Sequence, residues 1–481
     1  MIYLLYILLV IPLLIGVTAV RAVLCKKTLP AGKRYDKHSD EDLVYAERLS
    51  EMIKFKTIAV DAGGDQLQFD GFKKKLGELF PVFLRRAEEI LIDGAYLWKI
   101  KGATDGKPAL ILAHCDVVEA DGGWEAPPFD GVIKDGFIHG RGAFDNKGML
   151  CALLSAAEHL LEEGFTPQYD IYIGSTHNEE SSSEGIFHCR DYFEQNGIAF
   201  RSILDEGGAV TCGMMPGVEN DMAMVGLCEK GYMDIRFTFK GSGGHSSSPA
   251  KGNPLAQLSA FINYIENKKV FRKRIPPTVR EMFRAVAPHM RFPHRLLLCN
   301  FWLYSGLLKA VLPGIDPNIG AMMQTTIVFT RCEGSSSNNV IPTTAWAVAN
   351  IRNLPGESCE EVAAKLSAIA KKFGLEAEVL SEKCASSETS AESDAVAALS
   401  GMIGQVFPGT VVTPYMTTGA TDCCRLDSLS EQIVRFSPLR VTGEELEAVH
   451  GDNERLGIAQ LGRGVEFFKL YLSEMTGGRG Y

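Results

Sequence analysis

The stretch from His114 to Glu180 constrains the fold more than any other part of the chain, because polar side chains recur there where apolar runs end. One such run, 109–113, immediately precedes His114, and a second, 171–175, ends shortly before Glu180. A short apolar run bounded by polar or turn residues is typical of a buried strand. Since α/β sheets build their sites at strand ends, the pattern predicts an α/β fold with a site at this edge.

The side chains of this stretch are those of a metal site. One imidazole, His114, is combined with three carboxylates, which are Asp116, Asp145 and Glu180. Zinc, manganese and cobalt take nitrogen and oxygen ligands of this kind. At a strand end the neighbours Glu179 and Glu180 can diverge, so that one binds metal while the other acts as a general base. Alone, a Glu-Glu pair is more often a solvated surface feature.

The chain also carries a series of short motifs in a fixed order. They are H-x-D-V-V at 114–118, G-R-G-x-x-D-x-K-G at 140–148, E-E at 179–180, L-D-E-G-G at 204–208, G-G-H-S at 243–246, N-V-I-P at 339–342, R-F-S-P at 435–438 and H-G-x-N-E at 450–454. In this order they resemble the dizinc aminoacylase/carboxypeptidase family of metallopeptidases. The last two resemble in particular its Gly-X carboxypeptidase and N-fatty-acyl-amino-acid hydrolase branch.

The resemblance implies a zinc-peptidase-like catalytic domain of the α/β class, with a mixed, mostly parallel sheet flanked by helices, and an inserted smaller αβ lid. Local patterns agree: the apolar run 149–161 predicts a buried helix, and the alternation at 233–239 predicts a half-buried antiparallel strand. The expected divisions are an anchor at 1–20, a linker at 21–37, a first catalytic part at 38–226, a lid of the dimerisation type at 227–352 and a second catalytic part at 353–481.

Two divalent metal ions are also implied by the resemblance, with zinc expected and cobalt or manganese as alternatives. In the family pattern His114, Asp145 and Asp205 hold one ion. Glu180, Asp145 and His450 hold the other, so that Asp145 bridges the two. Without the resemblance, Asp205 is equally well explained as a turn residue before two glycines.

The catalytic roles follow from the same resemblance. Glu179 is the expected general base, and Asp116 is expected to accept the second N–H of His114 and so fix its tautomer. His245 is expected to stabilise the oxyanion, in some family members from the neighbouring subunit, which implies a homodimer through the lid. Apart from the family, a histidine in a Gly-rich loop is simply exposed to solvent.

Three further residues are candidates for substrate binding. A guanidinium matches a carboxylate with two parallel hydrogen bonds, so Arg352 is expected to anchor a terminal carboxylate, with a structural salt bridge as the alternative. Asn339 can add a hydrogen bond. Gly419 begins a G-A-T-D loop that resembles the family's Gly-Gly-Thr-Asp loop. Arg425 lies one place later than the branch pattern has it, which leaves its role open.

The expected reaction is hydrolysis of an amide bond next to a free carboxylate, by a carboxypeptidase or dipeptidase. An N-acyl-amino-acid amidohydrolase is the alternative within the enzyme class. A different class is a membrane-tethered protein that binds metal or amino-acid derivatives without turnover, and the presence of Glu179 disfavours it. A net charge of −10 argues against nucleic acid as a partner.

Two apolar segments bear on the membrane. Residues 1–20 carry no charge and match the length of a membrane-spanning helix, which predicts an uncleaved anchor, with a signal peptide as the alternative. Basic residues after it, such as Arg21 and Lys26, place the body in the cytoplasm by the positive-inside rule, with an extracytoplasmic body as the alternative. The segment 296–312 is either a buried lid helix or an apolar surface that holds an acyl chain or rests on the membrane.

The twelve cysteines show no C-x-x-C pair and no regular spacing. Neither a zinc ribbon nor a disulfide framework is therefore expected. Free thiols at this density favour a reducing compartment.

Overall fold

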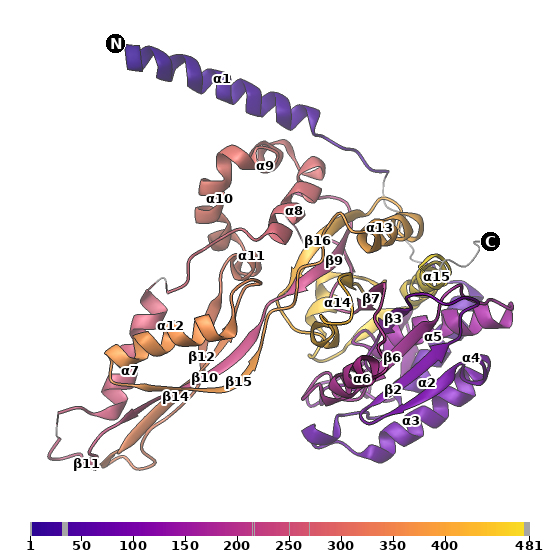
Figure 1. Cartoon of the computed structure of the whole chain (residues 1–481), viewed down its shortest axis with the longest axis horizontal. Coiled ribbons are helices and arrows are strands. Elements are labelled where there is room, and N and C mark those ends of the chain that lie inside the picture. The colour runs from indigo at the N-terminus through magenta and orange to yellow at the C-terminus, as the bar shows by residue number, and fades with distance from the viewer. Residues whose placement is uncertain are drawn as a thin grey trace.

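The structure, a computed structural model, describes residues 2–30, 37–213, 215, 217–249, 251–268 and 270–475, and of residues 2–9 it describes the backbone alone. Figure 1 shows a larger sheet enclosed by helices and, beside it, an elongated smaller sheet. A layer of short helices, α8 to α11, lies near their junction, and helix α1 extends outward above that layer. The arrangement is of the α/β class, with a mixed sheet flanked by helices and a second αβ unit.

The larger sheet has ten strands within the described residues, in the order β1-β2-β6-β3-β7-β17-β9-β8-β18, with β16 paired to β9. Strand β3 (Ala109–Leu112) runs parallel to both β6 (Ile171–Thr176) and β7 (Ser202–Asp205), and all three are buried along their length. The other strands are β1 (Glu88–Ile92), β2 (Ala95–Ile100), β8 (Val210–Thr211), β9 (Met222–Glu229), β16 (Val411–Thr417), β17 (Ile433–Arg435) and β18 (Arg440–Val441).

Helices cover both faces of this sheet. Successive residues of β3 show it, because Ile111 packs into one apolar cluster while Leu110 and Leu112 pack into another. The first cluster contains α5 (Lys147–Glu162), which is buried along most of its length as the run 149–161 predicts. The remaining elements on and around this sheet are α2 (Asp40–Ile53), η1 (Val60–Ala62), α3 (Gln66–Leu79), α4 (Pro81–Arg86), β4 (Val132–Lys134), β5 (Phe137–His139), α6 (Glu184–Gln195), α13 (Asp394–Val406), η3 (Asp422–Arg425), α14 (Gly443–Glu447), β19 (Arg455–Gly457) and α15 (Ile458–Glu474).

The smaller sheet, called the lid sheet below, has the order β12-β14-β10-β15. One of its two inner strands, β10, buries every second residue, among them Met233, Ile235 and Phe237, against two helices, as the alternation predicts. The elements are β10 (Tyr232–Lys240), α7 (Pro254–Asn267), β12 (Thr326–Glu333), β14 (Thr344–Arg352), α12 (Cys359–Lys372) and β15 (Glu376–Lys383). Strand β15 therefore lies in this sheet although it follows residue 352, where the sequence placed the end of the lid.

The segment 296–312 is not a buried helix. It is divided between α9 (Phe292–Leu298) and α10 (Phe301–Ile315), whose axes are bent by 106°. Within α10 only Leu308 is buried, while Trp302 is 57% exposed. The expectation of a buried lid helix is therefore wrong, because α10 presents most of its apolar side chains outward. The other helices of this layer are α8 (Pro277–Val286), η2 (Ala287–His289) and α11 (Pro317–Met322).

Helix α1 (Ile2–Leu24) is bound to this layer at its C-terminal end. Cys25 forms a disulfide with Cys299, so these two are not the free thiols that the spacing suggested, and the other ten cysteines are free. Among the described residues no single helix is both long and apolar enough to cross a membrane, and the expectation of a single-pass anchor at 1–20 is unsupported. Val10–Leu24 is a shorter apolar helix, and only the bent pair α9–α10 passes on length and composition together. The side chains of residues 1–9, on which much of that expectation rested, lie outside the described part.

Candidate dimetal active site

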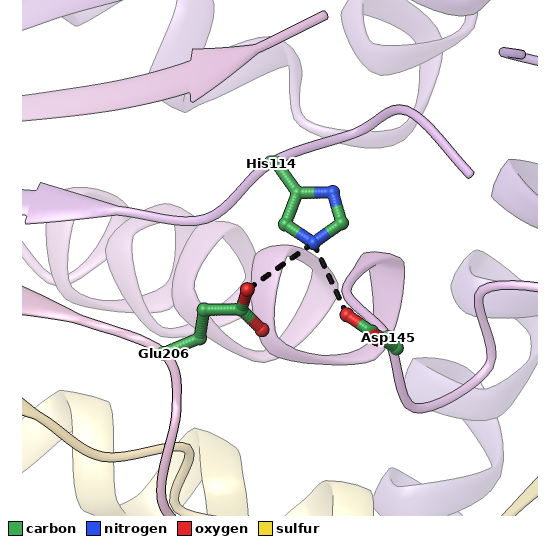
Figure 2. A group of neighbouring side chains, drawn as sticks. All are labelled: His114, Asp145 and Glu206. Atoms are coloured by element: carbon green, nitrogen blue, oxygen red, sulfur yellow. Dashed lines mark hydrogen bonds and ion pairs between the residues drawn. The ribbon is translucent and has the colours of Figure 1, made fainter. Parts of the chain in front are cut away.

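The site lies at the carboxyl ends of the parallel strands, and His114 is its centre. His114 follows β3 by two residues, and its ring is buried. Nε2 lies 3.1 Å from Asp145 Oδ1 and 3.4 Å from Glu206 Oε1. Figure 2 shows both carboxylates directed at this one nitrogen. Three side chains from separate segments thus converge on a point that a single cation can occupy.

A second group shares Asp145 with the first. Asp145 Oδ2 lies 3.1 Å from His450 Nε2, which in turn lies 2.9 Å from Glu180 Oε1. Within each group the possible ligand atoms all lie within 4.8 Å of one another. Asp145 therefore offers one carboxylate oxygen to each group, which is the arrangement of a bridging ligand.

The carboxylate that joins His114 and Asp145 is that of Glu206, whereas the sequence pointed to Asp205. Strand β7 ends at Asp205, whose carboxylate accepts hydrogen bonds from the backbone N–H of Cys423 (2.8 Å) and of Glu206 (2.9 Å). The carboxylate nearer to His114 is that of the next residue. Because neighbours at a strand end point in different directions, one of the two acids faces the site while the other secures the loop after it.

Asp116 does two things at once. The contact nearest to His114 Nδ1 is its backbone carbonyl, at 3.1 Å, with its carboxylate Oδ1 at 3.4 Å. The carboxylate itself accepts hydrogen bonds from the backbone N–H groups of Glu179 (3.2 Å) and Glu180 (3.0 Å). Asp116 is fully buried. It therefore orients the imidazole and also the segment that carries both glutamates.

Glu179 lies beside the possible metal ligands. Its carboxylate forms a third group with His114 and Glu180, again with all the possible ligand atoms within 4.8 Å of one another. Burial, with the negative charge of neighbouring acids, raises the pKa of Glu179 well above its ordinary value. A carboxyl group in such surroundings is suited to hold a proton and to release it.

The charge of the cluster supports the binding of two divalent cations. Six acidic side chains surround the two histidines; they are Asp116, Asp145, Glu179, Glu180, Asp205 and Glu206. Burial and the charge of Asp145 raise the pKa of Glu206 to about 8. A buried surplus of negative charge is unfavourable unless cations offset it. The imidazole and carboxylate donors fit zinc or a similar ion.

Glu454 is a positioning residue that sequence reasoning did not single out. Its buried carboxylate accepts hydrogen bonds from the backbone N–H of Gly142 (3.0 Å), Phe144 (2.9 Å) and Asp145 (3.1 Å). It also accepts one from Arg141 Nη1 (2.9 Å). The loop that presents Asp145 is thus held by one side chain. The signal was available, since this glutamate closes the H-G-x-N-E motif.

A second buried acid, also missed, supports the opposite side. Glu229 accepts hydrogen bonds from the backbone N–H of Thr421 (3.1 Å) and from the Thr421 hydroxyl, and it forms an ion pair with Arg435. Both charged groups are fully buried. Because Cys423 in the following turn donates to Asp205, this pair fixes the base of the loop that begins at Gly419. Arg435 belongs to the R-F-S-P motif.

His245 and Asn339 are not brought to the metal ligands. His245 belongs to β11 (Gly244–His245), which pairs with β13 (Val340–Ile341) next to Asn339. Figure 1 shows β11 at the end of the lid sheet that is remote from the ten-stranded sheet. The ring is exposed, and its Nδ1 lies 2.7 Å from Ser247 Oγ. In a single chain this imidazole faces solvent.

Arg352 and Gly419 do not belong to the three groups of possible metal ligands. Arg352 ends β14, its guanidinium lies 4.6 Å from the centre of the Tyr232 ring, and its Nε donates to Asn350 Oδ1 (3.3 Å). Among the described contacts Arg352 takes part in no ion pair, so the salt bridge considered from sequence is absent. Gly419 is exposed after β16, with open space where a side chain would begin. Arg425 stacks at 4.7 Å on the Phe187 ring.

Comparison with known proteins gives a consistent result. The model of "Peptidase family M20/M25/M40" matches residues 110–474. The chain is 31% identical over 444 residues to a probable carboxypeptidase S-like 2 of Dictyostelium discoideum, covering 89% of this chain and 84% of that protein. It is 32% identical over 384 residues to the N-fatty-acyl-amino acid synthase/hydrolase PM20D1 of Xenopus tropicalis, covering 79% and 75%.

Solved structures show the same fold. An M20 family metallo-carboxypeptidase from Sulfolobus solfataricus superimposes with a TM-score of 0.67, at 20% identity, over 90% of this chain and 99% of that one. The similarity spans both sheets, because it extends over nearly the whole length of both proteins.

Proposed function

Since this chain belongs to peptidase family M20/M25/M40, and is thereby a metal-dependent amide hydrolase, we propose that it cleaves an amide bond next to a free carboxylate. The observation that carries the proposal is the cluster around Asp145, in which two groups of metal-type ligands share one carboxylate and Glu179 lies beside both. A binding protein without turnover has no need for a partly buried Glu179 with a raised pKa at this place.

We assign the ligands of the two ions from the distances. His114, Asp145 and Glu206 would hold one ion, and Asp145, Glu180 and His450 would hold the other. Zinc is the ion that this set of imidazole and carboxylate donors fits. When bound, such cations would lower the pKa of a water molecule and polarise the carbonyl of a substrate.

The side chains of the chain itself move the proton. Glu179 accepts a proton from the attacking water and then delivers it to the leaving nitrogen. The Asp116 carboxylate keeps Glu179 in place by accepting a hydrogen bond from the Glu179 backbone N–H, and the Asp116 carbonyl orients the His114 ring through Nδ1. Both positions follow from hydrogen bonds that are present before substrate arrives, so the arrangement is preorganised.

The substrate carboxylate is assigned to Arg352. Its guanidinium is partly buried and forms no ion pair among the described residues, and burial lowers its pKa below the usual range. A cation in this state favours an anionic partner, and two parallel N–H groups match a carboxylate. Arg352 therefore selects substrates that end in a carboxylate, either peptides or N-acyl amino acids.

His245 is assigned to the active site of a second subunit. The lid sheet carries it away from the metal ligands of its own chain (Figure 1). In a two-fold dimer through the lid, an imidazole that reaches the site of the other subunit is matched by its symmetry equivalent, so both sites are completed in the same way. In that position it stabilises the oxyanion.

The test is release of free amino acids from a panel of dipeptides and N-acyl amino acids by the full-length protein with added zinc. Glu179→Gln keeps the shape of the side chain and removes the base, and activity should fall by about 10²- to 10⁴-fold. Glu194→Gln, on the exposed side of α6, is the matched control and should retain activity. Equal activity of wild type and Glu179→Gln would show that Glu179 is not the general base.

Two kinds of amide substrate fit this site, a peptide and an N-acyl amino acid. Carboxypeptidase or dipeptidase activity is our first assignment, in keeping with the name of the Dictyostelium relative. N-acyl-amino-acid hydrolysis is the second, favoured by the similarity to the frog N-fatty-acyl-amino acid synthase/hydrolase. The same panel separates them, since a long acyl chain in place of an amino-terminal residue should raise kcat/KM in the second case and lower it in the first.

A further inference from the structure

A cleft with a volume of about 740 Å³ lies between the end of α1, α8 and α10, far along the chain from the metal ligands. Among the described residues that line it are five cationic side chains and no acidic one. The cations are Arg21, Arg274, Arg280, Arg284 and Lys309. In a chain with a net charge of −10, such a one-sided lining favours an anionic ligand.

Most of this positive charge is not compensated within the protein. Arg284 pairs with Glu281 at 2.9 Å, and Arg274 lies 3.7 Å from a carboxylate oxygen of Glu357. The other three cations, Arg21, Arg280 and Lys309, take part in no ion pair among the described residues. The cleft therefore retains three free positive charges, enough to attract a phosphate or carboxylate group.

The rest of the cleft is apolar and continues onto an exposed apolar surface. Leu298, Phe301 and Trp302 line its wall. Beyond it, α10 exposes Trp302, Leu307 and Val311, with exposed fractions between 45% and 57%. On the neighbouring helix α1, Val20, Val23 and Leu24 are exposed by 57% to 78%. Charge and apolar surface thus adjoin, as they do in a lipid.

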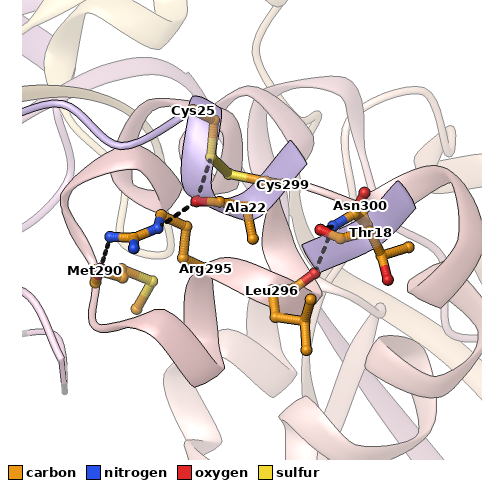
Figure 3. The surroundings of a disulfide bond; sticks show 8 residues. All are labelled: Thr18, Ala22, Cys25, Met290, Arg295, Leu296, Cys299 and Asn300. Atoms are coloured by element: carbon orange, nitrogen blue, oxygen red, sulfur yellow. Dashed lines mark hydrogen bonds between the residues drawn. A yellow bond between two sulfur atoms is a disulfide. The ribbon is translucent and has the colours of Figure 1, made fainter. Parts of the chain in front are cut away.

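The two helices are fixed to each other, so the cleft is a built feature. Figure 3 shows the Cys25–Cys299 disulfide at the end of α1. Beside it, Arg295 Nε donates to the Ala22 carbonyl at 2.6 Å, and Asn300 Nδ2 donates to the Thr18 carbonyl at 2.9 Å. Both donors are buried. A covalent bond and two buried hydrogen bonds hold Arg21 over the cleft.

We propose that this cleft binds the headgroup of an acidic phospholipid, with the outward faces of α1 and α10 resting in the adjoining acyl region of a membrane. The three free cations match an anionic headgroup, and the exposed apolar side chains match acyl chains. A soluble acidic metabolite would use the charges and leave the apolar surface in water. An apolar protein partner would leave the charges unpaired.

The test measures which lipid approaches Trp302. The full-length protein is placed in neutral detergent micelles that contain brominated phosphatidylcholine or brominated phosphatidylserine at equal mole fraction, and bromine quenches nearby tryptophan emission. The contribution of Trp302 is the difference between the protein and its Trp302→Phe counterpart. Brominated phosphatidylserine should give half-maximal quenching at a mole fraction lower by about tenfold than brominated phosphatidylcholine.

The preference should depend on the cleft and on nothing else. The double variant Arg280→Gln/Lys309→Gln should lose the preference for phosphatidylserine by about tenfold, while phosphatidylcholine still quenches through the apolar faces. Lys101→Gln/Lys134→Gln removes the same charge from exposed positions elsewhere and should keep the preference. Equal quenching by the two lipids in wild type overturns the proposal, and so does an equal loss in both double variants.

Discussion

Asp205 and Glu206 are adjacent acids with different tasks. Asp205 is held by two backbone N–H groups, whereas Glu206 faces His114 at 3.4 Å. We therefore expect Glu206→Gln to lower the metal content from about two ions to about one and activity by about 10²-fold. Asp205→Asn should retain both ions. Metal analysis by mass spectrometry after desalting decides, and loss of metal only in Asp205→Asn would restore the family pattern read from sequence.

Glu454 should matter as much as a ligand although it contacts no substrate. Glu454→Gln keeps the side-chain volume but leaves Arg141 buried without its ion pair and weakens three hydrogen bonds to the Asp145 loop. Metal affinity should fall by about 10- to 100-fold, and the free energy of unfolding by about 3 kcal/mol. Titration calorimetry and thermal unfolding measure the two effects. Glu444→Gln, which removes an exposed surface pair with Arg455, should change neither.

Lys230 makes the stability of the protein depend on pH. Its Nζ donates to Ala321 O, Gln324 O and Thr326 Oγ1, and burial lowers its pKa to about 7. An unfolded lysine has a pKa of about 10.4, so between these values the unfolded chain binds more protons than the folded one. The stability of wild type relative to Lys230→Met should therefore rise from pH 7 to 10, by up to about 1.4 kcal/mol per pH unit. Urea unfolding at several pH values measures it, and a difference that is flat or falls with pH would contradict the assignment.

The residue scale also shows which side chains the sequence could single out as neighbours. His114, Asp145, Glu180 and His450 were proposed from spacing and resemblance, and the structure brings them together. Spacing could not tell which acid of a neighbouring pair faces inward, because that depends on how the chain turns after β7. It also could not assign Glu454, whose partners lie more than 300 residues earlier in the chain.

At the scale of elements, helix α10 shows that composition alone does not predict whether an apolar helix is buried or exposed. An apolar segment looks the same in the sequence whether its partner is the protein core or another surface. Strand β3 and helix α5 were predictable because runs of apolar residues lay between signals that belong to an α/β layer. For 296–312 no periodicity separated an inner from an outer face, and the bend at Cys299 was not evident. The pairing of Cys25 with Cys299, 274 residues apart, was equally hidden.

The tether of α1 makes an element-scale prediction. Cys299→Ser removes the disulfide and leaves the hydrogen bonds from Arg295 and Asn300 as the remaining ties. Trypsin should then cut after Lys26 or Lys27 several-fold faster under non-reducing conditions, because local opening of the segment becomes more frequent. Fragment mass spectrometry measures the rate. Cys332→Ser, at an exposed free thiol, is the control, and equal rates in the two variants would show that the disulfide does not restrain this end.

At the scale of the whole molecule, the position of β11 leads to a prediction about assembly. The fold itself was accessible from the sequence, since ordered motifs pointed to a known family. The sequence could not show whether one subunit contains every residue of its active site. Only the arrangement of the two sheets shows that the strand carrying His245 lies far from the metal ligands (Figure 1). If each site borrows the imidazole of the other subunit, two inactive variants can restore one site between them.

Glu179→Gln and His245→Ala should each be nearly inactive alone. When equal amounts are mixed under conditions that exchange subunits, half of the dimers pair one chain of each kind, and each such dimer has a single intact site, made of Glu179 from one chain and His245 from the other. Activity should return to about a quarter of wild type, as two-fold symmetry requires. As a control, the double variant Glu179→Gln/His245→Ala is mixed with wild type. No dimer in that mixture gains an intact site by exchange, so the activity should not rise. A mixture that exchanges subunits but remains inactive would show that His245 acts within its own chain, through a movement of the lid sheet toward the metal ligands.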